Sequence, residues 1–337
     1  MDNSISIRKA ILHILDTNID IPVISQKELE LDGEIYNFLE KHLQKLLNDH
    51  NLKSAEFIGE VNEIRNICDK LNQNTQYFYQ ASIEIANKLF MILVKNVDIP
   101  SADLICCIFD YCNQPYFGIL KLNYKTGFTH FVLQEQEGNV NTIIRHRTML
   151  PTESQKIDEC AFINLDDLSV KLIEKAYEIN GEKEFYLSKL FLNCSTQLSD
   201  IEKIKIIEKA AKKVNKQFFD EDFDKPAKLK KAVAESFEET GSIQVDTIIE
   251  KVFENNIEVQ NECIEEIKKA GLVEKNIPVP EKLAERKFRI HKIKTDTGIE
   301  INFPSSYYND KEKIDFINNP DGTISIVIKN VGKIVNR

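Results

Sequence analysis

The chain has 337 residues, a length that favours two domains. Of these residues 42% are hydrophobic and 29% charged, a composition that excludes a disordered or fibrous protein. Its formal net charge of -10 excludes a protein that coats nucleic acid with its whole surface, so any such contact must use local basic patches. No apolar run reaches membrane-spanning length, and no secretory signal is recognisable. The seven cysteines form no paired motif, which indicates reduced thiols in a cytoplasmic protein.

The first 180 residues are predicted to form an α+β domain in which helices pack on an antiparallel sheet. A strand is expected at 4–16, and apolar residues recur at helical spacing over 32–48, 55–71 and 77–97. Four apolar segments at 102–109, 116–122, 128–133 and 140–146 follow at hairpin spacing, which predicts an antiparallel meander. Segments 160–163 and 170–177 are expected to extend the same sheet.

Residues 181–277 are predicted to be a helical segment, and residues 278–337 a small β-rich C-terminal domain. Helices are expected at 199–219, 225–240, 245–255 and 259–270, and Gly241 and Gly271 stand at the ends of two of them. In the C-terminal segment, apolar and polar residues alternate over 288–293, 299–303 and 323–328. Asp-Gly and Asp-Thr-Gly turn signals lie between these runs, as antiparallel strands joined by tight turns require.

Lysines form a stripe on the predicted helix 201–219. At about 100° per residue, apolar positions occupy one arc, and five lysines occupy a separate arc of similar width. Such a stripe can follow DNA phosphates, which gives sequence-independent and salt-sensitive affinity. It can equally be a solvated helix face. The five candidate residues are Lys205, Lys209, Lys212, Lys213 and Lys216.

The C-terminal segment is locally basic in an acidic chain. If 288–293 is a strand, Arg289 and His291 share the face opposite Phe288 and Ile290, which would make a basic outer surface. The alternative is that these charges protect an edge strand from aggregation. The candidate contacts here are Arg286, Lys287, Arg289 and Lys292.

Catalytic signals are scarce. The sequence contains no P-loop, no GxSxG, no HExxH and no GxGxxG, so no cofactor, metal site or enzymatic activity is predicted. A restriction-type nuclease would need an acid-x-Lys pair, but the segment that follows Asp103 and Asp110 carries Lys121 without the second acid. His13 and His130 are expected to be core or sheet histidines.

Taken together, three segments resemble the bacterial nucleoid-associated protein family represented by NdpA, also called YejK. They are residues 11–16 (Ile-Leu-His-Ile-Leu-Asp), the helical stretch 185–216, and the terminal segments 298–303 and 319–326. The resemblance extends over essentially the whole chain. It implies a cytoplasmic protein found with the nucleoid, linked to DNA binding and, in some members, to modulation of a type II topoisomerase, with no established catalysis.

The resulting expectation is a non-catalytic nucleoid-associated protein that contacts DNA phosphates through the nine lysines and arginines named above. The alternative is a protein–protein adaptor that reaches the nucleoid by binding a DNA enzyme such as a type II topoisomerase. Homo-oligomerisation is left open by the sequence.

Overall fold

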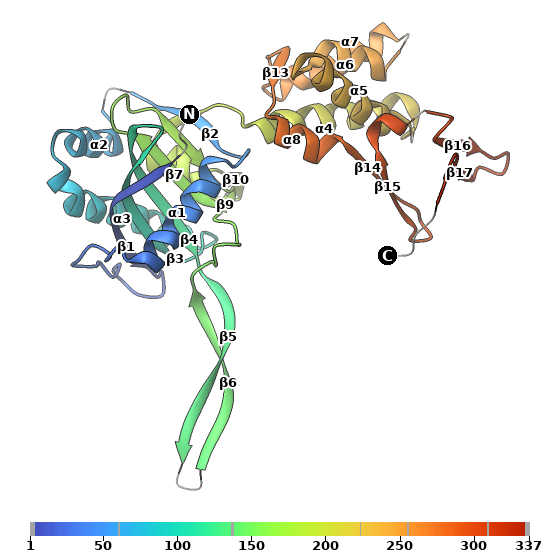
Figure 1. Cartoon of the computed structure of the whole chain (residues 1–337). Coiled ribbons are helices and arrows are strands. Elements are labelled where there is room, and N and C mark those ends of the chain that lie inside the picture. The colour runs from blue at the N-terminus through green and yellow to red at the C-terminus, as the bar shows by residue number, and fades with distance from the viewer. Residues whose placement is uncertain are drawn as a thin grey trace. The chain divides into compact units, whose positions relative to one another are not determined.

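The structure, a computed structural model, describes residues 4–59, 61–135, 138–222, 224–254, 256–308 and 310–333, without the side chains of Glu135, Lys282, Arg286 and Asn318. The chain divides into two compact units, Met1–Ser199 and Asp200–Arg337 (Figure 1). Both units combine helices with antiparallel strands, which confirms the α+β class. None of the described helices combines the length and the apolar character that crossing a bilayer demands.

The first unit is built on a seven-stranded sheet in the order β1-β3-β4-β7-β8-β2-β11, with every neighbouring pair antiparallel. Its strands are β1 (Ile5–Leu15), β2 (Lys53–Phe57), β3 (Ala102–Tyr111), β4 (Gln114–Asn123), β7 (Glu159–Asn164), β8 (Val170–Ile173) and β11 (Cys194–Thr196). Helices cover both faces, so β3 and β4 are almost wholly buried. This explains why their sequences are continuous apolar runs and not alternating ones.

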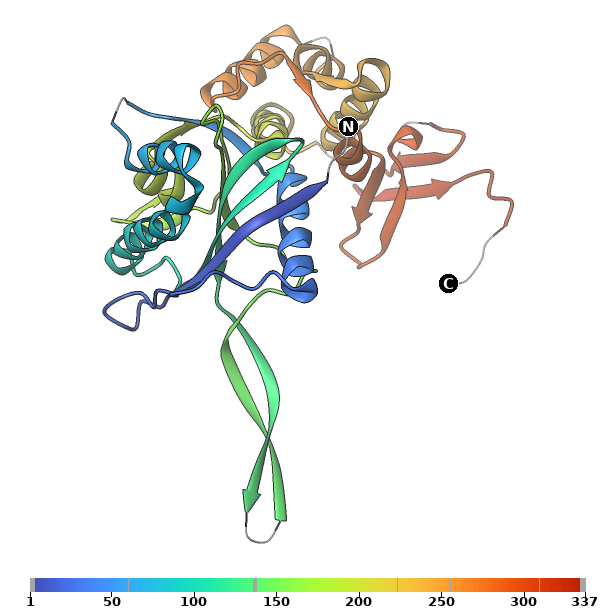
Figure 2. The same ribbon diagram turned by 60° about the vertical axis from the view of Figure 1, so that its left-hand side comes forward.

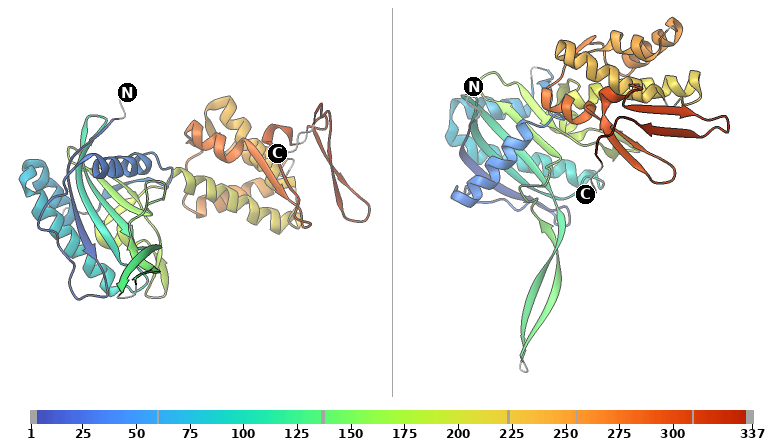
Figure 3. Two further views of the ribbon diagram at one scale, coloured as in Figure 1. Left: turned by 60° about the horizontal axis from the view of Figure 1, so that its bottom comes forward. Right: turned by 45° about the vertical axis from the view of Figure 1, so that its right-hand side comes forward.

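Helices make the outer layers of this unit, one layer on each side of the sheet, as the left panel of Figure 3 shows. Helix α1 (Gly33–Leu47) packs on one face through Leu39, Leu43 and Leu46. Helices α2 (Glu63–Gln73) and α3 (Phe78–Lys95) pack on the other face. The Asp32 side chain accepts a hydrogen bond from the Ile35 backbone N–H at 2.9 Å, and this N-cap fixes where α1 begins.

Shorter elements complete the first unit. The strands β9 and β10 pair with each other, and a π-helix leads into β11. The bounds of these elements are β9 (Tyr177–Ile179), β10 (Glu182–Glu184), the 3₁₀ turn η1 (Thr75–Tyr77) and the π-helix η2 (Leu187–Leu192).

Two details of the predicted first domain were wrong. The four-strand meander does not form, because β4 pairs with β7, and the intervening strands β5 (Lys125–Glu135) and β6 (Gly138–Met149) make a separate two-stranded arm. The arm extends away from the sheet in Figures 1 and 2. The helix expected over 55–71 is instead the strand β2 followed by α2, because local helical spacing could not reveal that β2 pairs with the distant β8.

The sheet contains a buried ion pair between Lys121 on β4 and Glu159 on β7, whose nitrogen and oxygen lie 3.0 Å apart. Glu159 also accepts hydrogen bonds from the hydroxyls of Tyr177 at 2.8 Å and Tyr186 at 2.5 Å and from the Asn123 amide at 2.8 Å. Burial lowers the pKa of Lys121, and the carboxylate of Glu159 opposes that shift. The carboxylate is therefore held by a complete set of donors, as a buried charge requires.

The second unit carries five helices among its described residues, α4 (Asp200–Phe219), α5 (Asp224–Thr240), α6 (Val245–Val252), α7 (Ile257–Lys269) and α8 (Glu281–Phe288). The first four lie at the expected positions. Gly241 ends α5 with φ of 67°, and Gly271 follows α7 with φ of 91°, both in the left-handed region that glycine favours.

Paired strands complete this unit, and the right panel of Figure 3 shows the terminal ones. Among its described residues, strands form three antiparallel pairs, β12 with β13, β14 with β15, and β16 with β17. Their bounds are β12 (Ser242–Gln244), β13 (Asn276–Pro278), β14 (Ile290–Lys294), β15 (Glu300–Pro304), β16 (Ile314–Asn318) and β17 (Ile324–Ile328), with the 3₁₀ turn η3 (Ser305–Tyr307) after β15.

The expected strand over 288–293 begins later than predicted. Residues 281–288 form α8, Arg289 is its C-cap, and β14 starts at Ile290. The predicted faces are also reversed, since His291 packs inward against Phe303 while Ile290 is 47% exposed. The packing of β14 against its own unit decides which of its side chains face inward. The basic residues of the sequence do not reveal which face that is.

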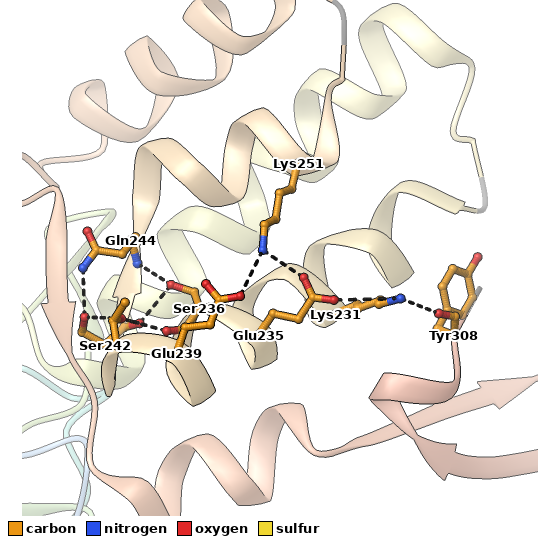
Figure 4. Close-up of polar contacts among 9 residues, drawn as sticks. Lys231, Glu235, Ser236, Glu239, Ser242, Gln244, Lys251 and Tyr308 are labelled. Carbon is orange, nitrogen blue, oxygen red and sulfur yellow. Dashed lines mark hydrogen bonds and ion pairs between the residues drawn. The ribbon is translucent and has the colours of Figure 1, made fainter. Parts of the chain in front are cut away.

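The C-terminal segment is attached to α5 by buried and polar contacts. Tyr308 is fully buried, its hydroxyl donates to Asp224 Oδ1 at 2.6 Å, and its carbonyl accepts from Lys231 Nζ at 3.1 Å. Figure 4 shows the Lys231 contact beside the ion pair of Lys251 with Glu235, whose atoms lie 3.0 Å apart. These contacts hold the terminal strands beside the helices of their unit.

We expect replacement of Lys121 by Met to lower the free energy of unfolding by about 3–5 kcal/mol, because it leaves the Glu159 carboxylate buried without a counter-ion. The double variant Lys121→Met, Glu159→Gln removes both charges and should lose clearly less. Urea unfolding followed by circular dichroism measures both values. A double variant as unstable as the single one would contradict this account of the ion pair.

Candidate nucleic-acid interface

A groove of about 730 Å³ lies in the second unit between α4, α5, α8 and β14. Apolar side chains such as Ile207, Leu229 and Ile293 line part of it. Its polar lining is rich in cations, because six lysines stand against three acids, Glu208, Glu221 and Asp222. The six lysines are Lys212, Lys225, Lys230, Lys287, Lys292 and Lys294.

The lysines reach the groove from segments far apart in the sequence. On α4, Ile204, Ile207 and Ala211 pack inward, which places Lys212 at the edge of the buried arc, on the groove. On β14, the alternation of the strand turns Lys292 and Lys294 outward while Ile293 packs inward. The attachment of Tyr308 to α5 keeps this strand close to the helices. The groove is therefore a product of tertiary packing.

Lys230 lies close enough to two other lysines for their charges to affect its pKa. Burial lowers its pKa, Glu208 opposes this shift, and the ammonium groups of Lys292 and Lys287 lower the pKa further. Glu208 also pairs with Lys287, with the nitrogen and oxygen 3.5 Å apart. One carboxylate thus lies among three ammonium groups, and a bound anion would reduce their mutual repulsion.

Two buried polar atoms on the groove lack a hydrogen-bond partner among the described residues. They are Asn215 Oδ1 and His291 Nδ1. The Asn215 amide nitrogen is occupied, since it donates to the Asp222 carbonyl at 2.9 Å. Burial is the main cause, and the charge of Lys230 a lesser one, of the low pKa of His291, about 4, so its ring is neutral near pH 7. The groove lining therefore contains two buried, neutral polar atoms without a partner among the described residues, beside its cations.

The structure separates the five lysines of the predicted stripe. Lys212 lines the groove, whereas Lys213 lies on the other flank and pairs with Glu266 of α7. Lys216 pairs with Glu221, with the atoms 3.4 Å apart. Lys205 and Lys209 are exposed, with no carboxylate of the described residues at ion-pair distance. The five lysines share an arc of about 100° on the helical projection of α4. An arc of this width has two sides, and the side chains on each side meet different neighbours.

The predicted basic residues of the C-terminal segment also separate. Lys287 and Lys292 line the groove together with Lys212, so the structure brings three of the nine candidates to one place. Arg289 pairs instead with Glu285, one helical turn away, at 3.1 Å. Arg286 lies on α8, and its side chain is outside the described part of the structure.

Sequence reasoning did not place three groove lysines, Lys225, Lys230 and Lys294, among the candidates. The lysine cluster over 225–231 is visible in the sequence, but its members have different roles. Lys228 pairs with Glu254, and Lys231 binds the Tyr308 carbonyl, while Lys225 and Lys230 line the groove. Helical projection of α5 against a known buried face could have made this distinction.

Candidate catalytic residues lie in the first unit and do not come together. Asp103 is paired with Leu122 across β3 and β4, so it faces the side of the sheet opposite to Lys121. Burial raises the pKa of Asp103 to about 6. His13 is fully buried, with its two ring nitrogens bonded to Ser82 Oγ at 3.0 Å and to the Ser25 N–H at 3.1 Å, as a core histidine should be.

We expect replacement of Lys230 by Met to raise the pKa of His291 above about 4, because it removes a positive charge that disfavours the imidazolium. Burial remains, so the pKa should stay below the ordinary 6.5. Titration of the His291 ring signals by NMR measures it. Lys203→Met, on the flank of α4 that pairs with Glu274, is the control and should leave the pKa of His291 unchanged.

Comparison with known proteins supports the resemblance read from the sequence. No curated protein matches the chain significantly. Residues 11–335 match the sequence model of the NA37 family, which is described as nucleoid-associated protein YejK. The match spans almost the whole chain and includes both compact units. The chain therefore belongs to the NA37 family of nucleoid-associated proteins.

Proposed function

We propose that this nucleoid-associated protein contacts DNA directly and without sequence preference, through phosphates bound at the lysine-lined groove of its second unit. The observation that carries the proposal is the convergence of Lys212, Lys287 and Lys292 from α4, α8 and β14 on one groove. Phosphate contacts made by lysine supply sequence-independent affinity. The proposal places the protein in the cytoplasm, on the chromosome, in a non-catalytic role.

The electrostatics of the groove favour an anionic ligand. Burial lowers the pKa of Lys230, and the ammonium groups of Lys292 and Lys287 lower it further, against the opposing charge of Glu208. A phosphate placed among them would stabilise all three ammonium groups. The exposed Lys205 and Lys209 continue the positive surface along α4 and would contact neighbouring phosphates. This gives an acidic protein a local site for a polyanion.

The rival function is that of an adaptor that binds a DNA enzyme such as a type II topoisomerase. The net charge of -10 and the terminal hairpin favour it. Strands β16 and β17 expose apolar residues, including Ile324 at 44% and Ile328 at 56%, and the hairpin could receive a strand of a partner. In that case purified protein would not bind DNA, or its binding would not depend on the groove.

We expect the triple variant Lys212→Gln, Lys287→Gln, Lys292→Gln to weaken binding to unrelated duplexes by equal factors. Because each lost phosphate contact removes about 0.9 from the slope of log K against log salt, the slope should fall by roughly 2–3. Fluorescence anisotropy of the full chain over a salt series measures both. The matched control, Lys27→Gln, Lys171→Gln, Lys183→Gln, removes the same charge from the first unit and should bind as the unchanged protein does.

A second set of variants tests the lysines of α4, of which Lys212 also lines the groove. The five-lysine variant, with glutamate at 205, 209, 212, 213 and 216, should lose DNA binding, whereas Lys213→Glu alone should have little effect because Lys213 is paired with Glu266. An affinity that does not change between low and physiological salt would refute phosphate contact. Unchanged binding in both lysine sets, or no binding by the original protein, would favour the adaptor.

A further inference from the structure

The arm formed by β5 and β6 is the part of the first unit that its fold does not require. It connects β4 to β7, and these two strands are hydrogen-bonded neighbours in the sheet. Adjacent antiparallel strands need only a tight turn between them. The chain instead continues through an ordered ribbon of 11 and 12 residues in its two strands.

The arm is apolar on both of its faces. From the strand register, one face carries Phe128, Val132 and Ile143, and the other carries Phe131, Leu133, Val140 and Ile144. Phe128 is 71% exposed and Ile143 is 75% exposed, and the other five are between 39% and 47% exposed. Together these seven residues expose roughly 700 Å² over the two faces, or roughly 350 Å² on each face, so each face is within the size range of the largest apolar patch on a typical monomer, which is often functional.

The arm is also incomplete as a sheet. Among the described residues, β5 and β6 pair only with each other, so the outer edge of each strand presents unpaired backbone N–H and C=O groups. A two-stranded ribbon in water is marginally stable at best, and stability normally needs a third strand or a packed face. The arm therefore needs a cover that supplies apolar surface and a strand edge.

The sequence of the arm argues against DNA as that cover. Its cations, Lys125, Arg145 and Arg147, lie in the half next to the sheet. Residues 129–144, the outer part, contain no lysine or arginine and include two glutamates. A ribbon that enters a DNA groove needs cations where it meets the phosphates.

We propose that the arm pairs with the arm of a second copy of this chain and makes the protein a homodimer. A second arm supplies both things that the first lacks, an equally long strand edge and an apolar face of the same composition. Twofold dimers, in which the same surface of each copy meets its counterpart, are the commonest symmetric assemblies of identical chains. When the second arm covers both faces, the exposed apolar area of roughly 700 Å² per copy is close to the 800 Å² that each partner contributes to a standard interface.

Dimerisation would also strengthen contact with DNA. Each copy carries one lysine-lined groove, and two linked grooves bind a polymer with much higher avidity than one. The arm and the groove lie in different units, so the pairing does not depend on the DNA proposal and is tested without DNA.

The test is sedimentation velocity of the full chain, without DNA, from about 1 to 100 μM. The protein should sediment at about twice its chain mass of 38.9 kDa. The double variant Phe131→Glu, Ile143→Glu places one charge on each face of the arm and should weaken dimerisation on the order of a hundredfold or more. The control Val61→Glu, Val97→Glu makes the same charge change at sites 84% and 98% exposed in the same unit, and should remain dimeric.

Hydrogen exchange supplies a second measurement. Amides of β5 or β6 should be protected in the dimer and lose protection on dilution, while amides of β3 and β4 stay protected at all concentrations, which also shows that the variants fold. A monomer over the whole concentration range would overturn the proposal, as would a dimer that persists in the double variant. Protection of the arm that requires added DNA or a different protein would assign it to that partner instead.

Discussion

The attachment of the C-terminal segment to α5 is the contact on which the candidate interface depends. Tyr308 is buried and anchored at both ends, through its hydroxyl on Asp224 and its carbonyl on Lys231. Phe303 and Ile314 pack in the same cluster with Ala227 of α5. Because β14 leads into this anchor through β15, the lysines of β14 are held beside those of α4 and α5. A local apolar cluster thereby determines where positive charges gather.

The groove shows how a protein with a negative net charge can carry a local binding site for a polyanion. A surface of mixed sign keeps the whole protein from binding nucleic acid indiscriminately, while a concentrated patch acts over about a Debye length of 8–10 Å. Several lysines elsewhere are neutralised by close acids, as Lys213 is by Glu266 and Lys203 by Glu274. The groove differs because its lysines outnumber its acids. The placement of carboxylates therefore shapes the positive surface as much as the placement of lysines.

Sequence patterns predicted those features that depend on local structure. The position of α1, the glycine ends of α5 and α7, and the alternation of β15 and β17 are all local, and all were located within a few residues. Strand partners were not predictable, because β4 and β7 meet across 35 intervening residues and β2 meets β8 across a longer interval. The groove could not be predicted from the sequence either. Three of its six lysines belonged to two separate groups of candidates, and only tertiary packing shows that Lys212 and Lys292 share one surface while Arg289 pairs with Glu285.

The adjacency of β4 and β7 has an evolutionary consequence. Since these strands pair directly, the segment between them can change in length or composition without altering the register of the sheet or the layers that cover it. Selection can therefore act on the arm separately from the core. Where a genome encodes several related chains, divergence of this one ribbon would let each chain recognise its own kind and reject the others, while the fold that supports the ribbon stays the same.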